Sequence, residues 1–220
     1  VKIGEGVEIH PFVVIYDNVT IGDNTVIYPG CVIGKEPNGA GITSRPLVYA
    51  PDTVIGSGCA IGPNATVFCD VKVGNHVLIG DNSSIRENSR IGNSVIIGRC
   101  VTILYNVKIG DEVEIHDRCH ITGNVVIENN VFIAPAVTSC NDNGIENRYY
   151  DEKTVIGPTI RHHATIGAGA LLMPGVEIGH NSMVAAGALV TKDVKPYALV
   201  MGLPAREVKR LEQNESWEQS

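Results

Sequence analysis

Two histidines, His116 and His120, are the residues of this 220-residue chain best suited to proton transfer. A neutral imidazole can accept a proton from an attacking nucleophile near neutral pH. Asn141 follows in a polar segment, and its side-chain amide could orient a substrate. These three residues are the candidate catalytic groups, with His120 as the first choice for the base. Ordinary surface positions are the alternative for both histidines.

Candidate substrate-binding residues recur at intervals of 18. One series is Glu87, Tyr105, Gly123 and Asn141, and the neighbouring series is Asp70, Asn88, Asn106, Asn124 and Asp142. Such residues stack in columns if 18 residues make one coil of a repetitive structure. We expect substrate contacts from Glu87, Tyr105, Asn106, Asn124 and Asp142. By residue type alone, a structural role is favoured for the second series, because Asn and Asp suit tight left-handed corners.

Bare backbone marks two segments nearer the C-terminus. Gly167-Ala168-Gly169 and Ala185-Ala186-Gly187 carry almost no side chain, so a thin ligand such as a pantetheine arm can lie against their N–H and C=O groups. Lys192 and Arg206 follow within a basic region, which would attract phosphates. These eight residues are the candidate cofactor-binding residues.

A six-residue period specifies the elements that position these side chains. Ile, Val or Leu begins each of 26 hexads, in blocks that run Ile3–Ile33, Ile55–Ile133 and Ile160–Val190. A small residue or Val stands two places before the next aliphatic, and Gly, Asn or Asp often precedes it. This pattern predicts short inward-facing strands joined by tight corners, with three hexads per coil and nearly nine coils about 4.8 Å apart.

The period breaks twice, which predicts protruding loops at about 34–50 and 139–154. Loops on a rigid scaffold commonly carry binding and catalysis, whereas tolerated surface insertions are the alternative. We expect the prism to span 1–195 and a tail to span 196–220, in which Pro204 begins a short α-helix that returns Val208 and Leu211 to the prism.

Composition excludes several classes of protein. The net charge of −7 argues against nucleic acid as a partner, and no apolar run is long enough for a membrane span. The six cysteines form no CxxC pair, so a zinc ribbon is excluded, and Cys31, Cys59 and Cys119 are predicted to be small core residues. We expect no metal site. The N-terminus has no signal-peptide pattern, which predicts a cytoplasmic protein with reduced thiols.

The hexad pattern resembles the hexapeptide-repeat, left-handed parallel β-helix family over about residues 1–195, and the left hand is implied by that resemblance. The segments Val190-Thr191-Lys192-Asp193-Val194 and Gly202-Leu203-Pro204-Ala205-Arg206 resemble its acetyl-CoA-dependent acyltransferase branch. The runs Tyr105-Asn106-Val107, His120-Ile121-Thr122-Gly123-Asn124 and Cys140-Asn141-Asp142-Asn143 resemble N-acetyltransferases that act on nucleotide-linked amino sugars.

This resemblance implies an acetyltransferase that moves an acetyl group from acetyl-CoA to the amine of a nucleotide-linked sugar. Cell-surface polysaccharide synthesis, such as that of lipopolysaccharide, is the implied setting, and a homotrimer with sites between neighbouring prisms is the implied assembly. The base would be a side chain or the departing coenzyme thiolate. The alternatives are a sugar O-acetyltransferase, a carbonic-anhydrase-like metalloprotein and a non-catalytic prism.

Overall fold

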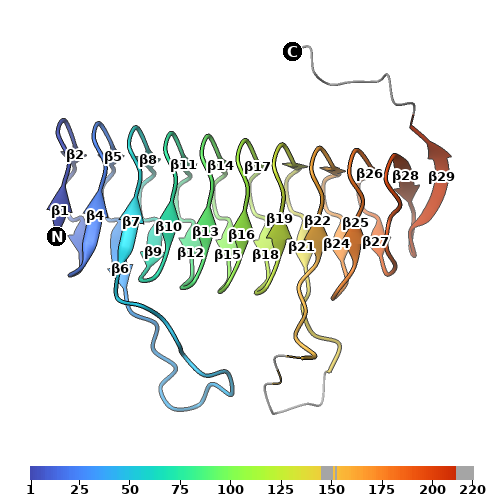
Figure 1. The fold of residues 1–220 in the computed structure, drawn as a ribbon, viewed down its shortest axis with the longest axis horizontal. Coiled ribbons are helices and arrows are strands. Elements are labelled where there is room, and N and C mark those ends of the chain that lie inside the picture. The colour runs from blue at the N-terminus through green and yellow to red at the C-terminus, as the bar shows by residue number, and fades with distance from the viewer. Residues whose placement is uncertain (145–150, 152, 212–220) are drawn as a thin grey trace.

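The computed structural model describes residues 1–144, 151 and 153–211, which form a left-handed parallel β-helix. Nine coils, each of three short strands, stack along one axis, and two loops leave the prism on the same side (Figure 1). Strands one coil apart pair in parallel at an offset of 18 residues, as in Ile85↔Ile103. The predicted all-β prism of hexad repeats is therefore confirmed.

Three sheets form the walls of the prism. Sheet A contains β1 (Lys2–Ile3), β4 (Val19–Ile21), β7 (Thr53–Ile55), β10 (Lys72–Val73), β13 (Arg90–Ile91), β16 (Lys108–Ile109), β19 (Val126–Ile127), β22 (Thr159–Ile160) and β25 (Glu177–Ile178). Sheet B contains β2 (Glu8–Ile9), β5 (Val26–Ile27), β8 (Ala60–Ile61), β11 (Leu78–Ile79), β14 (Ile96–Ile97), β17 (Glu114–Ile115), β20 (Phe132–Ile133), β23 (Thr165–Ile166), β26 (Met183–Val184), β28 (Ala198–Met201) and β29 (Arg206–Arg210). Sheet C contains β3 (Val14–Ile15), β6 (Val32–Lys35), β9 (Thr66–Phe68), β12 (Ser84–Ile85), β15 (Thr102–Ile103), β18 (His120–Ile121), β21 (Thr138–Ser139), β24 (Leu171–Leu172) and β27 (Leu189–Val190).

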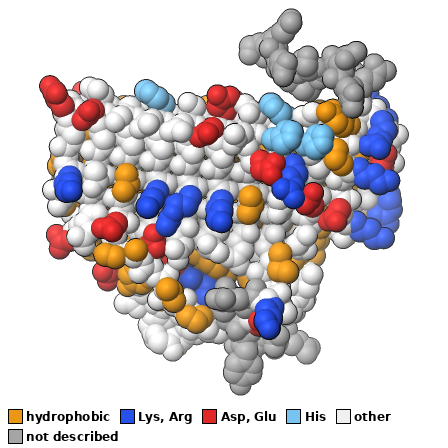
Figure 2. All heavy atoms as spheres, viewed as in Figure 1, with side chains coloured by type: hydrophobic (Ala, Val, Ile, Leu, Met, Phe, Trp, Pro, Cys, Tyr) orange, Lys and Arg blue, Asp and Glu red, His pale blue; other side chains and the backbone are white. Residues whose placement is uncertain are grey.

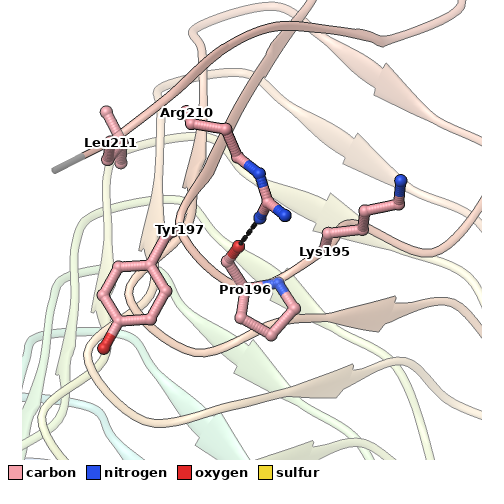
Figure 3. Close-up of a pocket in the computed structure, with 5 residues that line it drawn as sticks. All are labelled: Lys195, Pro196, Tyr197, Arg210 and Leu211. Atoms are coloured by element: carbon pink, nitrogen blue, oxygen red, sulfur yellow. Dashed lines mark hydrogen bonds between the residues drawn. The ribbon is translucent and has the colours of Figure 1, made fainter. Parts of the chain in front are cut away.

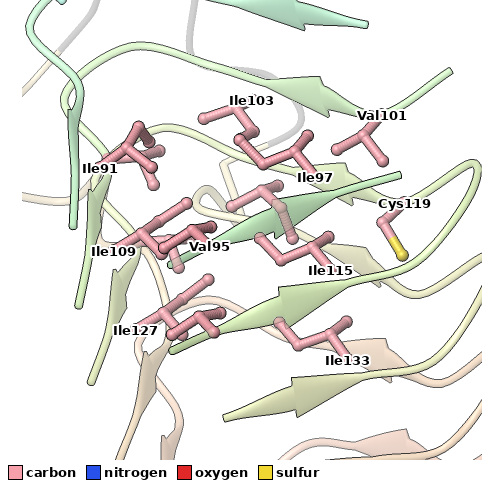
Figure 4. Packing of buried hydrophobic residues seen from close by; sticks show 14 of the residues in the cluster. Ile91, Val95, Ile97, Val101, Ile103, Ile109, Ile115, Cys119, Ile127 and Ile133 are labelled. Carbon is pink, nitrogen blue, oxygen red and sulfur yellow. The ribbon is translucent and has the colours of Figure 1, made fainter. Parts of the chain in front are cut away.

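The leading aliphatic residues fill the prism (Figure 4). Most are completely buried, and Cys31, Cys59 and Cys119 lie among them as predicted. The leading residues of the first coil are the exceptions, since Ile3 and Ile9 are 52% and 43% exposed and Ile15 is only partly buried. Each interior side chain contacts the coils above and below, so a coil is stable only with its neighbours.

Replacing Ile103 with Ala is expected to lower the free energy of unfolding by about 2–5 kcal/mol, because the side chain is wholly buried in a central coil. Urea titration measures the change. Ile3→Ala is the matched control, and its effect should be much smaller because that side chain is half in solvent. Equal losses in the two variants would contradict the continuous core.

Left-handed backbone at the corners is imposed by the coil, as the hexad pattern predicts. Asn18, Asn64, Asn106 and Asn124 have φ near +60°, and Gly6, Gly58, Gly169 and Gly187 adopt the same region. Phe12, Cys100, Arg118 and Ala136 are forced into it as well. The left-handed conformation costs about 1–2 kcal/mol of free energy for each of these residues. Packing of the aliphatic core must offset this cost, since every coil needs three corners.

The loops begin and end slightly differently from the predicted bounds. Strand β6 continues to Lys35, so the first loop is 36–52, and β21 ends at Ser139, so the second loop is 140–158. Both loops replace the corner between sheets C and A, which we call the C–A corner and which includes Asn88, Asn106 and Asn124. Residues 145–150 and 152 of the predicted second loop lie outside the described residues.

The predicted helix after Pro204 is wrong within the part of the chain that is described. Residues 198–210 instead form an antiparallel hairpin in which β28 stacks on β26 and β29 pairs with β28. The open edge of sheet B explains this outcome, because β29 satisfies backbone groups that a helix would leave unpaired. Val208 is 49% exposed in this strand. Nowhere in the described ranges is there a helix that could cross a membrane.

Candidate functional site

His120 lies on the outer face of sheet C, below the second loop. It opens β18 and pairs with Thr102 in the coil below and Thr138 in the coil above. Ile121 points into the core, so strand geometry turns the imidazole outward, where it is half-buried. The second loop leaves the prism one coil above, directly after β21, as the 18-residue spacing predicts.

His116 lies on the other side of a corner from His120. This corner joins sheets B and C and turns at Arg118; we call it the B–C corner. The His116 ring packs against Phe132 on the outer face of sheet B, with ring centroids 4.9 Å apart, and its Nε2 is 3.4 Å from a Glu114 carboxylate oxygen. The two candidate histidines therefore face different walls of the prism.

Glu87 is the anchor of a buried ion cluster at the C–A corner. Its side chain is completely buried, Arg86 donates to both carboxylate oxygens at 2.8 and 3.1 Å, and Arg45 from the first loop donates to one of them. Burial alone would raise the pKa of Glu87, but the hydrogen bonds from Arg86 and Arg45 hold that pKa below its usual value. In this arrangement Glu87 holds the first loop rather than presenting an open carboxylate to a substrate.

Tyr105 connects the first loop to the start of the second loop. The Arg45 guanidinium lies over the Tyr105 ring, 3.7 Å from its centroid, and Asn141 donates to the Tyr105 hydroxyl at 3.5 Å and to the Gly123 carbonyl at 3.1 Å. The predicted column of Glu87, Tyr105, Gly123 and Asn141 is therefore a physical set of neighbours. It brings two loops, separated by about a hundred residues of chain, to one corner.

The asparagines of the C–A corner fasten both loops to the prism. Asn88 donates to the Val48 carbonyl of the first loop at 2.7 Å, and Asn124 donates to the Val155 carbonyl of the second loop at 2.8 Å. The Asn106 side-chain amide donates to the side-chain oxygen Oδ1 of Asn124 at 2.7 Å. Asn106 and Asn124 also have positive φ, so their corner role is structural, whereas substrate contact through their second N–H stays a prediction.

Asp142 lies just beyond this corner. It is exposed and accepts a hydrogen bond from the Gly144 backbone N–H at 2.6 Å, which is an Asx turn at the start of the second loop. This bond uses one carboxylate oxygen of Asp142 and leaves the other for further contacts.

The bare segments stack on the B–C corner. Gly169 donates to the Pro135 carbonyl at 3.0 Å and Gly187 donates to the Ala168 carbonyl at 2.8 Å, so each segment lies on the coil below. A side-chain carbon added at Gly169 or Gly187 would meet nothing within 4 Å. The column continues downward through Ala134, Pro135 and Ala136 to the coil of His116 and His120. It forms a smooth strip three coils long.

Lys192 and Arg206 lie at different corners. Lys192 is exposed after β27 on the C–A side, whereas Arg206 follows the turn that closes over the B–C side. There Leu189 donates to the Gly202 carbonyl at 3.0 Å and accepts from the Ala205 N–H at 2.8 Å. Arg206 is thus the cation beside the upper end of the smooth strip, and Lys192 is separated from that strip by the width of sheet C.

A hollow of about 410 Å³ lies at the C-terminal end, remote from both loops. It is lined by Lys195, Pro196, Tyr197, Arg210 and Leu211, and Arg210 donates to the Pro196 carbonyl at 2.6 Å across it (Figure 3). Three histidines gather beside this end (Figure 2), where the rings of His162 and His180 stack 4.9 Å apart and His163 meets His162 edge-on. Among the residues that the structure describes, no three His, Cys, Asp or Glu side chains form a group that could hold a metal ion.

Arg45 is the residue of this site that the sequence reasoning missed. It stands in a loop outside the hexad register, so no column predicts its position. The sequence feature that could have indicated its role is an arginine, followed by Pro46, inside the first break of the hexad period in an acidic chain.

Glu87→Gln is expected to lower the free energy of unfolding by about 2–4 kcal/mol at pH 7, because two arginines lose a buried charged partner. The pKa of Glu87 is depressed by folding, so its stabilisation is present above the ordinary Glu pKa of about 4.3 and is lost as the pH falls through the depressed value. Urea titrations from pH 7 to pH 3 should therefore show the two proteins converging in acid. A constant difference across this range would contradict the assignment.

Comparison with known proteins identifies the repeat. The family model described as "Bacterial transferase hexapeptide (six repeats)" matches residues 1–35, 70–104, 106–138 and 157–192. The unmatched segments contain the first loop and residues 140–156 of the second loop.

Curated relatives match over shorter stretches. A serine acetyltransferase of Buchnera aphidicola is 36% identical over 88 residues, which cover 39% of this chain and 31% of that protein. The galactoside O-acetyltransferase of Escherichia coli is 38% identical over 88 residues, covering 39% and 43%. A chloramphenicol acetyltransferase of Klebsiella aerogenes is 47% identical over 57 residues, covering 26% and 25%. The chain thus spans less than half the length of each of these relatives.

Solved structures share the fold over most of this chain. A UDP-N-acetylglucosamine acyltransferase from Campylobacter jejuni has a TM-score of 0.74 and 20% identity, and the match covers 92% of this chain and 75% of that one. The corresponding enzyme of Francisella novicida has a TM-score of 0.57 and 20% identity, covering 92% and 70%. With the family model matching well over half of its residues, the chain belongs to the bacterial transferase hexapeptide family.

Proposed function

We propose that this protein transfers an acetyl group from acetyl-CoA to the amino group of a nucleotide-linked amino sugar used in cell-surface polysaccharide synthesis. One observation carries the proposal: His120 lies on sheet C between two unlike surfaces. The smooth strip of the B–C corner can take an extended pantetheine arm, and the loop-covered C–A corner can take a polar acceptor. The acetyltransferase names of the curated relatives support the donor.

In the proposed reaction, the neutral amine of the acceptor attacks the thioester carbonyl. The N–C bond forms, the C–S bond breaks, and the electron pair of that bond leaves on the coenzyme sulfur. His120 takes the proton from the nitrogen and returns it to the thiolate, and backbone N–H groups stabilise the oxyanion. Asn141 fixes the acceptor side through Tyr105 and Gly123. If His120 is not the base, the thiolate itself takes the proton.

We propose a homotrimer with parallel prism axes. Tyr16 and Tyr28 are 44% and 39% exposed, as expected for outward aromatic residues, whereas Phe68 and Leu104 are half-buried within the single chain. Leu78 and Ile96, in neighbouring coils of sheet B, are 44% and 39% exposed and add a second apolar surface. A stable monomer by light scattering at micromolar concentration would count against the trimer and against a site shared between prisms.

The deciding experiment is a thiol-release assay with acetyl-CoA and a panel of nucleotide-linked amino sugars. Each amino sugar is paired with the sugar that has a hydroxyl in place of the amine, because the similarity to a galactoside O-acetyltransferase makes O-acetylation the second candidate. Release with the amines alone supports the proposal, and release with the hydroxyl sugars favours O-acetylation. Inactivity on both, together with stoichiometric bound zinc, would favour the carbonic-anhydrase-like alternative.

A further inference from the structure

A small polar hollow lies between the first loop and the C–A corner. Its volume is about 180 Å³, and its lining comprises Arg45, Pro46, Val48, Asn88, Tyr105, Asn106 and Asn124. Sites for whole ligands of drug size have about 300–1,000 Å³. This hollow therefore fits one substituent of a larger ligand, with the remainder lying outside it.

Arg45 is held rigidly at the wall of the hollow. Its side chain is only 15% exposed, because Glu87 pairs with one end of the guanidinium and the Tyr105 ring covers its face. Glu87 is itself saturated by Arg86, so the cluster of two arginines and one glutamate carries a net positive charge. A guanidinium fixed by a buried carboxylate and an aromatic ring loses little entropy when it binds a ligand.

Donors outnumber acceptors on the ligand side of the hollow. Arg45 uses one N–H on Glu87 and one on the Pro46 carbonyl, which leaves three of its five donors. Asn88 and Asn106 each use one amide N–H on a carbonyl oxygen and keep the second. Among the described residues that line the hollow, none is Asp or Glu. Positive charge, unused N–H groups and the absence of a carboxylate wall together select an oxyanion.

We propose that this hollow binds an oxyanion group of the acceptor, a phosphate or a carboxylate, and that Arg45 is the residue that recognises it. This inference rests on the proposed function for its acceptor. Glu87 and Tyr105 are positioning residues that aim Arg45. The oxyanion would dock between the first loop and the C–A corner and leave the rest of the acceptor to extend over sheet C toward His120.

Direct binding of acceptor fragments tests this proposal without turnover. Titration calorimetry would use UDP, dTDP, inorganic diphosphate and glucuronate with the full chain, so that phosphate and carboxylate sources are distinguished. Arg45→Gln should weaken binding of the preferred probe at least about tenfold, the scale of one charge-assisted hydrogen bond. Arg45→Lys keeps the positive charge but lacks the planar guanidinium, so its affinity for the probe should lie between those of wild type and Arg45→Gln. Arg161→Gln is the matched control, since Arg161 also joins two carboxylates, Glu128 and Glu177, but on sheet A.

The outcomes separate this inference from the proposed function. If Arg45→Gln binds every probe as wild type does, or if wild type binds no probe at millimolar concentration, the oxyanion site is wrong even when acetyl transfer is observed. If binding depends on Arg45 but no amino sugar is acetylated, the site stands and the proposed function fails. A melting temperature for Arg45→Gln equal to that of Arg161→Gln excludes general unfolding. If Arg45→Gln does not fold, the proposal is tested with Arg45→Lys instead. Wild-type affinity for the preferred probe in Arg45→Lys would contradict recognition by the planar guanidinium of Arg45.

Discussion

Replacing His120 with Asn is expected to lower kcat/KM for acetyl transfer at least about 10²-fold, the lower range for loss of a general base. The half-buried imidazole faces outward from sheet C, so the aliphatic core and the proposed trimer should be unaffected. Steady-state kinetics measure the loss, and a melting curve verifies the fold. Asn141→Ala should show a comparable loss, because Asn141 joins the start of the second loop to Tyr105 and Gly123.

Two further histidine variants show whether the loss of activity is specific to His120. His163→Asn is the matched control, because His163 occupies a left-handed corner between sheets A and B that Asn readily adopts. Its activity should equal that of wild type. His116→Asn tests the competing base, which faces sheet B beside Glu114 and Phe132. Activity of His120→Asn within about threefold of wild type would assign proton removal to His116 or to the coenzyme thiolate.

Ala186→Trp is expected to raise the KM for acetyl-CoA about 10²-fold, the scale of loss when a reacting group is misplaced by about 1 Å. Ala186 is exposed on the smooth strip, so an indole there covers the surface proposed for the pantetheine arm without entering the core. Ala168→Trp, one coil below, should raise the KM for acetyl-CoA to a similar extent. Arg206→Ala should have a smaller effect in the same direction by removing a phosphate contact. The KM for the acceptor should change little in all three.

Pro63→Trp is the control for this experiment. Pro63 occupies the same corner column as Ala168 and Ala186, six coils away from Ala186, about 29 Å at 4.8 Å per coil. The variant therefore places the same indole at the same kind of corner far from the proposed coenzyme. An unchanged KM in Ala168→Trp, Ala186→Trp and Arg206→Ala would remove the coenzyme from this end of the prism.

Local sequence determines most of this fold because each hexad forms the same unit of one short strand and one corner. Each hexad specifies an inward aliphatic, an inward small residue and a corner, and each coil meets only the coils beside it. The sequence alone therefore predicted the prism, the positive φ at Asn106 and Asn124, the burial of Cys119 and the pairing that sets His120 below the second loop. The 18-residue columns predicted that Glu87, Tyr105 and Asn141 are neighbours.

The tertiary structure decided what no hexad specifies. Arg45 stands outside the register, and only its long-range contacts with Glu87 and Tyr105 bring it to the C–A corner and turn Glu87 from an expected substrate ligand into a buried anchor. His116 and His120 are close in sequence but face different walls, because a corner at Arg118 lies between them. The tail became a β-hairpin rather than a helix, since the open edge of sheet B offered hydrogen bonds that local helix signals could not anticipate. Periodic backbone pairing is encoded locally, whereas ion pairs, loop docking and edge capping depend on groups that are far apart in the chain.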